Sequence, residues 1–168
     1  MNTRNIGHRF PYSGIGADGH PYSCSFADWD GPKGQDDALL DDLSPLEQEI
    51  ALLWVRECLR PRKTINKMHT SYGIKHWLEH DTKIYMTNNM FKDLLLREGY
   101  KHSNEHDINW TYAISESSPT LSLRAVRADR GEWLEKQHPD LARKLDDEYS
   151  ERSRRLEEAR VTNKKNNH

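Results

Sequence analysis

The feature that most constrains this sequence is a series of helix start and stop signals between residues 44 and 100. Ser44-Pro45-Leu46-Glu47 places a capping serine before a proline at the first helical position, with a glutamate three residues after the cap. This combination predicts a helix start. Apolar residues then recur at helical spacing on a broad stripe until Pro61 ends the pattern. We therefore expect a helix that is buried on more than one side.

Two further helices are predicted after this one. A capping residue at position 70 or 71 precedes a second helix over residues 72–81, whose apolar residues lie three and four positions apart. Thr87 caps a third helix, and Gly99 stands where a left-handed C-terminal cap belongs. The third helix is therefore predicted to cover residues 88–98.

The residues after the third helix alternate between apolar and polar, as in a β-strand. Residues 108–115 predict a half-buried strand, and residues 121–125 alternate again. Because a lone strand is not stable, we expect the two to form a hairpin. The alternative is that Ser118-Pro119 opens a helix. From Pro139 onward, a narrow apolar stripe between dense opposite charges predicts a long solvated helix.

The composition limits how much of the chain such a core can bury. Charged residues make up 31% of the 168 residues, and the mean hydropathy is −1.00. A chain this polar is expected to build one compact core with loosely attached ends. We expect an arm over 1–43, which holds six of the nine glycines, a core over 44–126, and a helix and tail over 127–168. The predicted fold class is mainly α with a small β-hairpin.

Charge is distributed unevenly along the chain. Residues 1–55 carry nine acidic and three basic residues, a net charge of −6, whereas residues 56–100 carry five acidic and nine basic residues, a net charge of +4. Residues 101–168 carry thirteen of each. A positive middle segment favours an acidic partner such as a nucleic acid, but it equally allows the acidic arm to fold over the middle of the chain itself.

Several classes of protein are disfavoured. Cys24 and Cys58 form no CxxC pair, so neither a zinc knuckle nor a disulfide scaffold is indicated. No apolar run approaches the roughly 18 residues of a membrane span, and the N-terminus lacks a signal-peptide core, so we expect a cytoplasmic protein. The glycines of residues 14–19 match GxGxxG, but the flanking residues do not predict a strand before it and a helix after it. We therefore expect no cofactor.

Three helices followed by a hairpin is the element order of a winged helix–turn–helix, in which the third helix enters the major groove of DNA. Asparagine and arginine can read base edges, and lysine neutralises phosphate. The expected nucleic-acid contacts are Arg62, Lys63, Lys67, His69 and Lys75 before the third helix, and Asn88, Asn89, Lys92 and Arg97 on it. Asp93 and the length of the preceding link, about five residues, count against this interpretation.

Histidine spacing provides a catalytic alternative. His76, Glu79 and His80 match HxxEH, a zinc-hydrolase pattern in which two histidines one helical turn apart bind the metal and the glutamate activates water. His102 and His106 repeat the pattern in a polar loop. No further metal ligand is identifiable, and the simpler interpretation places His76 and His80 on the solvated side of a helix. We therefore expect no catalytic residues.

A resemblance adds context. The phrase His69-Thr70-Ser71-Tyr72-Gly73-Ile74-Lys75-His76, then Tyr85-Met86-Thr87-Asn88-Asn89-Met90-Phe91 and Gly99-Tyr100, resembles a motif of small uncharacterised proteins from bacterial phages and plasmids. Those relatives tend to have glycine where Asn89 stands. The resemblance implies no activity. It implies a regulator or accessory protein of a mobile element, acting in the bacterial cytosol on DNA or on a host or phage protein.

A protein partner defines the main alternative function. An interaction factor of this kind would inhibit or redirect a host machine, such as a defence complex. In that case the aromatic residues of the N-terminal arm and the charged C-terminal helix would make the contact.

Overall fold

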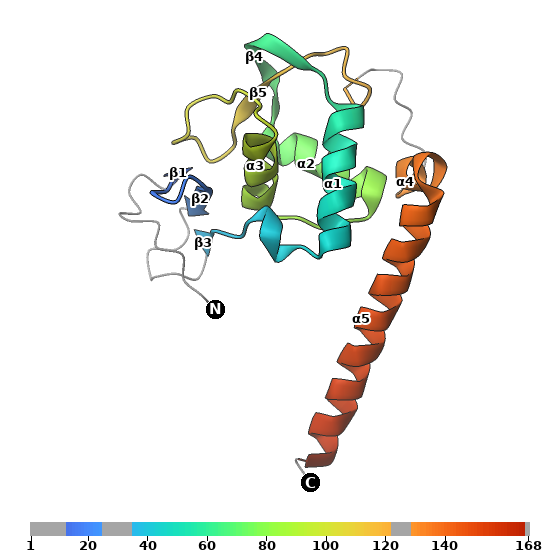
Figure 1. The fold of residues 1–168 in the computed structure, drawn as a ribbon. Helices are drawn as coiled ribbons and strands as arrows, with labels where there is room; N and C mark the ends of the chain where they lie inside the picture. The colour runs from blue at the N-terminus through green and yellow to red at the C-terminus, as the bar shows by residue number, and fades with distance from the viewer. Residues whose placement is uncertain (1–12, 25–34, 122–128, 167–168) are drawn as a thin grey trace.

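The computed structural model describes residues 13–24, 35–121 and 129–166, which form a mixed α and β protein (Figure 1). The described residues contain five α-helices and two small antiparallel sheets. The helices are α1 (Pro45–Cys58), α2 (Ser71–Thr82), α3 (Asn88–Arg97), α4 (Glu132–Gln137) and α5 (Pro139–Asn166). The prediction of three successive helices followed by β structure and a long C-terminal helix is confirmed at this level.

The first three helices begin at the capping residues that the sequence predicted. The Ser44 hydroxyl accepts the Glu47 N–H, while the Glu47 carboxylate accepts the Ser44 N–H, which forms a complete capping box. The hydroxyls of Thr70 and Thr87 cap α2 and α3 by accepting the N–H groups of Gly73 and Met90. Gly99 follows α3 with φ +77°, the left-handed conformation that favours glycine.

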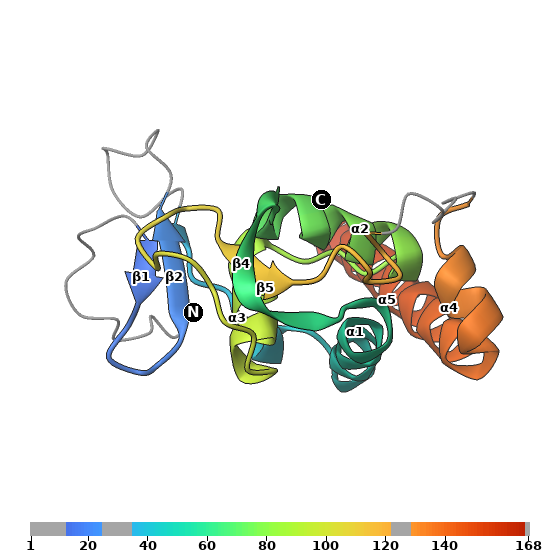
Figure 2. The same ribbon diagram turned by 90° about the horizontal axis from the view of Figure 1, so that it is seen from above.

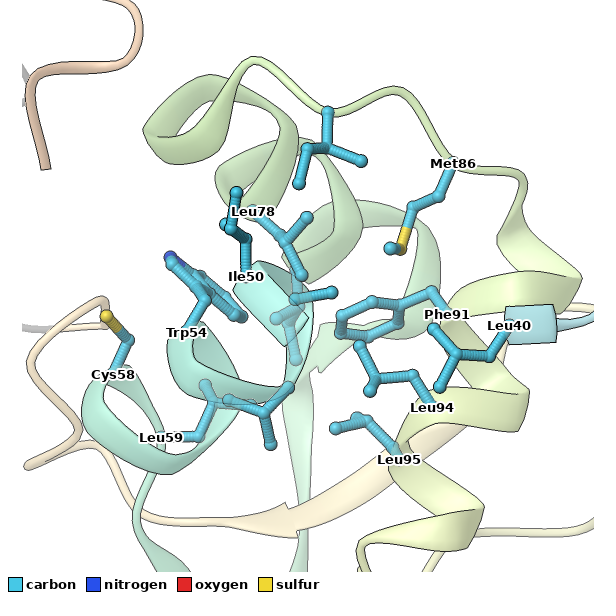
Figure 3. Packing of buried hydrophobic residues seen from close by; sticks show 14 of the residues in the cluster. Leu40, Ile50, Trp54, Cys58, Leu59, Leu78, Met86, Phe91, Leu94 and Leu95 are labelled. Atoms are coloured by element: carbon cyan, nitrogen blue, oxygen red, sulfur yellow. The ribbon is translucent and has the colours of Figure 1, made fainter. Parts of the chain in front are cut away.

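One hydrophobic core lies between α1, α2, α3 and the strands (Figure 3). Ile50, Trp54 and Phe91 are fully buried within it. Burying a large apolar side chain contributes roughly 1.5–3 kcal/mol. The one polar atom of the Trp54 ring is also satisfied, because its Nε1–H donates to Asp81 Oδ2 at 2.8 Å. The core therefore fixes the relative positions of α1 and α2.

The second sheet pairs β4 (Pro61–Thr70) with β5 (Thr111–Ile114). Residues 108–115 were predicted to form a hairpin with residues 121–125. The prediction of a strand is confirmed for β5, but the predicted pairing partner is wrong, because β5 pairs with β4. The second edge of β5 is occupied by residues 101–103, which exchange backbone hydrogen bonds with it. Residues 122–128 themselves lie outside the described residues. The pairing of β4 is irregular, and buried Asn66 bridges one register shift by donating to Ile114 O at 3.1 Å.

The first sheet belongs to the N-terminal arm. It comprises β1 (Ser13–Ile15), β2 (Pro21–Cys24) and β3 (Gln35–Asp36), in that order. The glycines that match GxGxxG lie in the hairpin between β1 and β2, where Gly19 has φ +78°. This sheet lies beside α3 (Figure 2). The described part of the arm is therefore packed against the core.

The C-terminal helix is attached to the core only at its beginning. Ala142 and Leu145 are buried, and the Tyr149 hydroxyl donates to Glu47 at 2.9 Å. Residues 152–164 are all exposed, and α5 extends away from the body of the protein (Figure 1).

Before α4, Gly131 has φ +88° and lies so close to the Lys83 side chain that a Cβ atom would not fit. Among the described residues, none of the helices has the length and apolar character required to cross a bilayer.

Candidate nucleic-acid interface

The structure separates the nine predicted contact residues into two groups. One group is buried or engaged within the protein and comprises Lys75, Asn88, Asn89, Lys92 and Arg97. The other group lies along β4 and comprises Arg62, Lys63, Lys67 and His69, with His69 partly covered. The two groups therefore do not form the single surface that the sequence predicted.

Lys92 lies at the centre of the contact between α3 and the arm. Its side chain is fully buried, and its Nζ donates to Ser13 Oγ at 3.1 Å and to Ser23 Oγ at 2.9 Å. The ammonium group lies 4.8 Å from the centre of the Trp110 ring. Burial lowers the pKa of Lys92 from 10.5 to about 8, because a charged amine loses hydration there. Lys92 thus holds β1 and β2 against α3.

The N-terminus of α3 is also covered by the arm. The Asn89 N–H donates to Asp36 Oδ2 at 2.9 Å, and its side-chain amide donates to Pro21 O at 2.8 Å and to Ala38 O at 2.9 Å. Asn88 is engaged on the other side, where it donates to the carbonyl of Ile108 at 3.1 Å. These asparagine amides therefore bind the protein's own backbone.

A charge cluster joins the end of the arm to the middle of α3. The buried Asp93 carboxylate accepts the Leu40 N–H at 3.0 Å, and it contacts Arg97 at 2.8 Å and His20 at 2.8 Å. Arg97 also forms a bidentate pair with Asp41, at 3.0 Å and 2.7 Å. The hydrogen bonds from Arg97 lower the pKa of Asp41, and the same pair raises the pKa of Arg97.

These contacts correct the prediction that Asn88, Asn89, Lys92 and Arg97 form an exposed edge of the third helix. Asn89 and Lys92 have no exposed surface, and the charge of Arg97 is matched by two carboxylates. The physical reason is that the arm folds over α3. Asp41 of the arm pairs with Arg97, whereas Lys92 is covered by Ser13 and Ser23, and Asn89 donates to backbone carbonyls. The sequence allowed this arrangement but did not select it.

Among the predicted contact residues, the exposed cations lie on β4, and we refer to Arg62, Lys63 and Lys67 as the basic strand. Lys63 and Lys67 form no ion pair with any residue that the structure describes. Arg62 donates to the backbone carbonyls of Thr64 and Ile65, at 2.7 Å and 2.8 Å. Because these carbonyls are uncharged, they do not neutralise the positive charge of the guanidinium group. Elsewhere cations are commonly paired with carboxylates, as in Arg56–Glu98, Lys83–Glu135, Arg97–Asp41 and Arg152–Glu148.

One carboxylate lies beside the basic strand. Glu116 accepts from the Asn66 side chain and lies 3.0 Å from His69 Nε2. The hydrogen bond from Asn66, and then that of His69, lowers the pKa of Glu116, so this group stays ionised at neutral pH. The net charge around β4 nevertheless remains positive, because Glu116 offsets only one of the cations.

Aromatic side chains continue this surface onto α2. Tyr72 is 52% exposed and Tyr85 is 70% exposed, and we refer to them, together with His76, as the aromatic patch. The Tyr72 and His76 rings meet edge to face with their centres 4.5 Å apart. β4 leads directly into α2, so the end of β4 and the start of α2, which carries Tyr72, are consecutive in the chain (Figure 2).

Lys75 supports this patch instead of binding a partner directly, as the sequence predicted. Its Nζ is paired with Glu79 at 2.9 Å and lies 5.3 Å from the centre of the Tyr72 ring and 5.8 Å from that of Tyr85. Only 4% of Lys75 is exposed. Nothing in the spacing of the tyrosines indicated this patch, because Tyr85 reaches it from the link before α3.

The histidine pattern on α2 has a structural role. The Glu79 carboxylate receives the Lys75 ammonium, the Met86 N–H at 3.2 Å and His76 Nδ1 at 2.8 Å, so its oxygens are occupied. In the second copy, His102 stacks on Trp110 with the ring centres 4.2 Å apart. Within the described ranges, no group of three histidine, cysteine or carboxylate side chains is arranged to hold a metal ion. The geometry of Glu79 and its neighbours therefore does not favour the zinc-hydrolase alternative.

Comparisons of this chain with protein-family models, with curated proteins and with solved structures find no match.

Proposed function

We propose that this protein is a non-enzymatic nucleic-acid-binding accessory protein that docks through the basic strand. The observation that carries the proposal is the exposure of Lys63 and Lys67 on one strand without a carboxylate partner among the described residues. Unpaired surface cations bind phosphates with release of counterions, which provides sequence-independent affinity. The resemblance to proteins of phages and plasmids would place this activity in a mobile element within the bacterial cytosol.

The proposed docking mode differs from that of a winged helix–turn–helix. In that fold the third helix inserts into the major groove. Here the arm lies over α3 and binds its polar side chains, so the proposal assigns the contact to β4 and the start of α2. Both terminal nitrogens of Arg97 are already bound to carboxylates, Nη1 to Asp41 and Nη2 to Asp41 and Asp93.

A gel-shift experiment with a charge-matched control tests the proposal. The double variant Lys63→Glu with Lys67→Glu is expected to bind more weakly, because two phosphate contacts are replaced by repulsion. The control is Lys144→Glu with Lys164→Glu, which makes the same change in net charge on the exposed face of α5. Equal loss of binding in both variants, or no loss in the first, would refute the placement on β4.

A second candidate function is supported by α5. Residues 154–164 are exposed, and among them Leu156 is 59% and Val161 45% exposed. Exposed apolar residues on a projecting helix are typical of a helix that binds another protein. The test is a pull-down from nuclease-treated host lysate. The full chain should retain a host protein that a shortened chain ending at Ser153 does not retain. Retention by the shortened chain would exclude this role for α5.

A further inference from the structure

The exposed tyrosines of the aromatic patch rest on a buried cation. Tyr72 and Tyr85 come from different segments, α2 and the link before α3, yet both rings lie within 6 Å of Lys75 Nζ. The ammonium group is almost fully buried and is held by Glu79. Tyr72 nevertheless stays 52% exposed and Tyr85 70% exposed, so each ring has surface that a ligand can reach.

We propose that the basic strand and the aromatic patch together bind single-stranded nucleic acid, an inference that rests on the proposed function. The bases stack on Tyr72 and Tyr85, while Lys63 and Lys67 contact the phosphates. A cationic strand beside exposed rings is the combination that sequence-tolerant single-strand binders use, because every base has a face that can stack. The bases of a duplex are already stacked on one another and leave no face for the two rings.

The dimensions of the surface suit a short single strand. Lys63 and Lys67 are separated by at most roughly 13 Å along an extended strand. The ring of His69, at the end of β4, lies 5.3 Å from that of Trp77, so the end of β4 packs against α2, the helix that carries Tyr72.

Fluorescence anisotropy with a labelled oligothymidylate and a labelled duplex of the same length tests this inference on the full chain. We expect the single strand to bind more tightly than the duplex. Tyr72→Ala and Tyr85→Ala should each weaken single-strand binding on the order of tenfold, whereas Tyr72→Phe and Tyr85→Phe should retain it, since only the ring is needed. Both tyrosines are largely exposed, and unchanged thermal unfolding verifies that each variant is folded.

The possible outcomes separate this inference from the function on which it rests. Equal or tighter duplex binding that depends on Lys63 and Lys67 but not on the tyrosines would overturn the single-strand assignment and leave the proposed function intact. Absence of binding to either oligonucleotide would overturn both. If a purified protein binds this chain in the presence of nuclease, and if that binding is lost when Tyr72 and Tyr85 are replaced, the surface binds protein and the inference is overturned.

Discussion

Replacement of Lys92 by methionine changes a buried charge at the contact between the arm and α3. Methionine matches the length of the lysine stem but carries no charge, so the variant keeps the packing and removes the ammonium group. In the native protein this group is fully buried, and its two hydrogen-bond partners are the uncharged hydroxyls of Ser13 and Ser23. The ammonium is therefore destabilising relative to its state in the unfolded chain.

The size of this destabilisation follows from the lowered pKa of Lys92. A decrease from 10.5 to about 8 corresponds to about 3 kcal/mol at neutral pH, since one pKa unit is worth about 1.4 kcal/mol. The folded protein releases the Lys92 proton near pH 8, whereas the unfolded chain retains it up to about pH 10.5. Between these values the unfolded state binds more protons, so the native protein gains stability as the pH rises.

The assay is urea unfolding of the native protein and of Lys92→Met at pH 7 and pH 10. The free energy of unfolding of the native protein, relative to the variant, is expected to rise by about 2–3 kcal/mol between these pH values. Taking the difference cancels other titrating groups, such as Tyr112, whose pKa is raised by burial. If the difference in the free energy of unfolding between the native protein and the variant is the same at both pH values, the interpretation of Lys92 as a buried charge is refuted.

Four further variants test other parts of the structure. Gly73→Ala should stabilise the protein by about 0.5–1 kcal/mol in urea unfolding, because a methyl group fits on the exposed helix. Leu145→Ala should destabilise it by about 2–4 kcal/mol, whereas Leu156→Ala, on the free part of α5, should change stability by less than about 0.5 kcal/mol. Asp41→Asn should lower stability at neutral pH but not under acidic conditions, because the Arg97 partner depresses the pKa of this carboxylate and its contribution is lost as the pH falls through that value. Equal effects of the two leucine changes, or an Asp41→Asn effect that persists in acid, would contradict the contacts described.

The sequence predicted the helices well because their ends are specified locally. Ser44, Thr70 and Thr87 lie next to the N–H groups that they cap, and Gly99 lies next to the carbonyls that it follows. All of these signals act over three or four residues. The three helix starts were therefore predicted to within a residue or two.

The strands and the site depend on contacts between distant residues, which the pattern does not encode. No strand was predicted over β4, whose ten residues are mostly polar and whose partner β5 lies more than forty residues further along the chain. Lys92 was predicted to be exposed, since lysine is rarely buried without a carboxylate partner. Its burial results from Ser13 and Ser23, which no local signal associates with α3.

The salt dependence of binding tests the central claim most directly. We expect the logarithm of the affinity for a single-stranded oligonucleotide to fall linearly with the logarithm of salt concentration. In Lys63→Glu with Lys67→Glu the slope should be smaller in magnitude by about 1.4, the loss of two phosphate contacts on a single strand, while Lys144→Glu with Lys164→Glu should retain the native slope. Parallel lines for the native protein and the Lys63/Lys67 variant would contradict the assignment of phosphate binding to the basic strand.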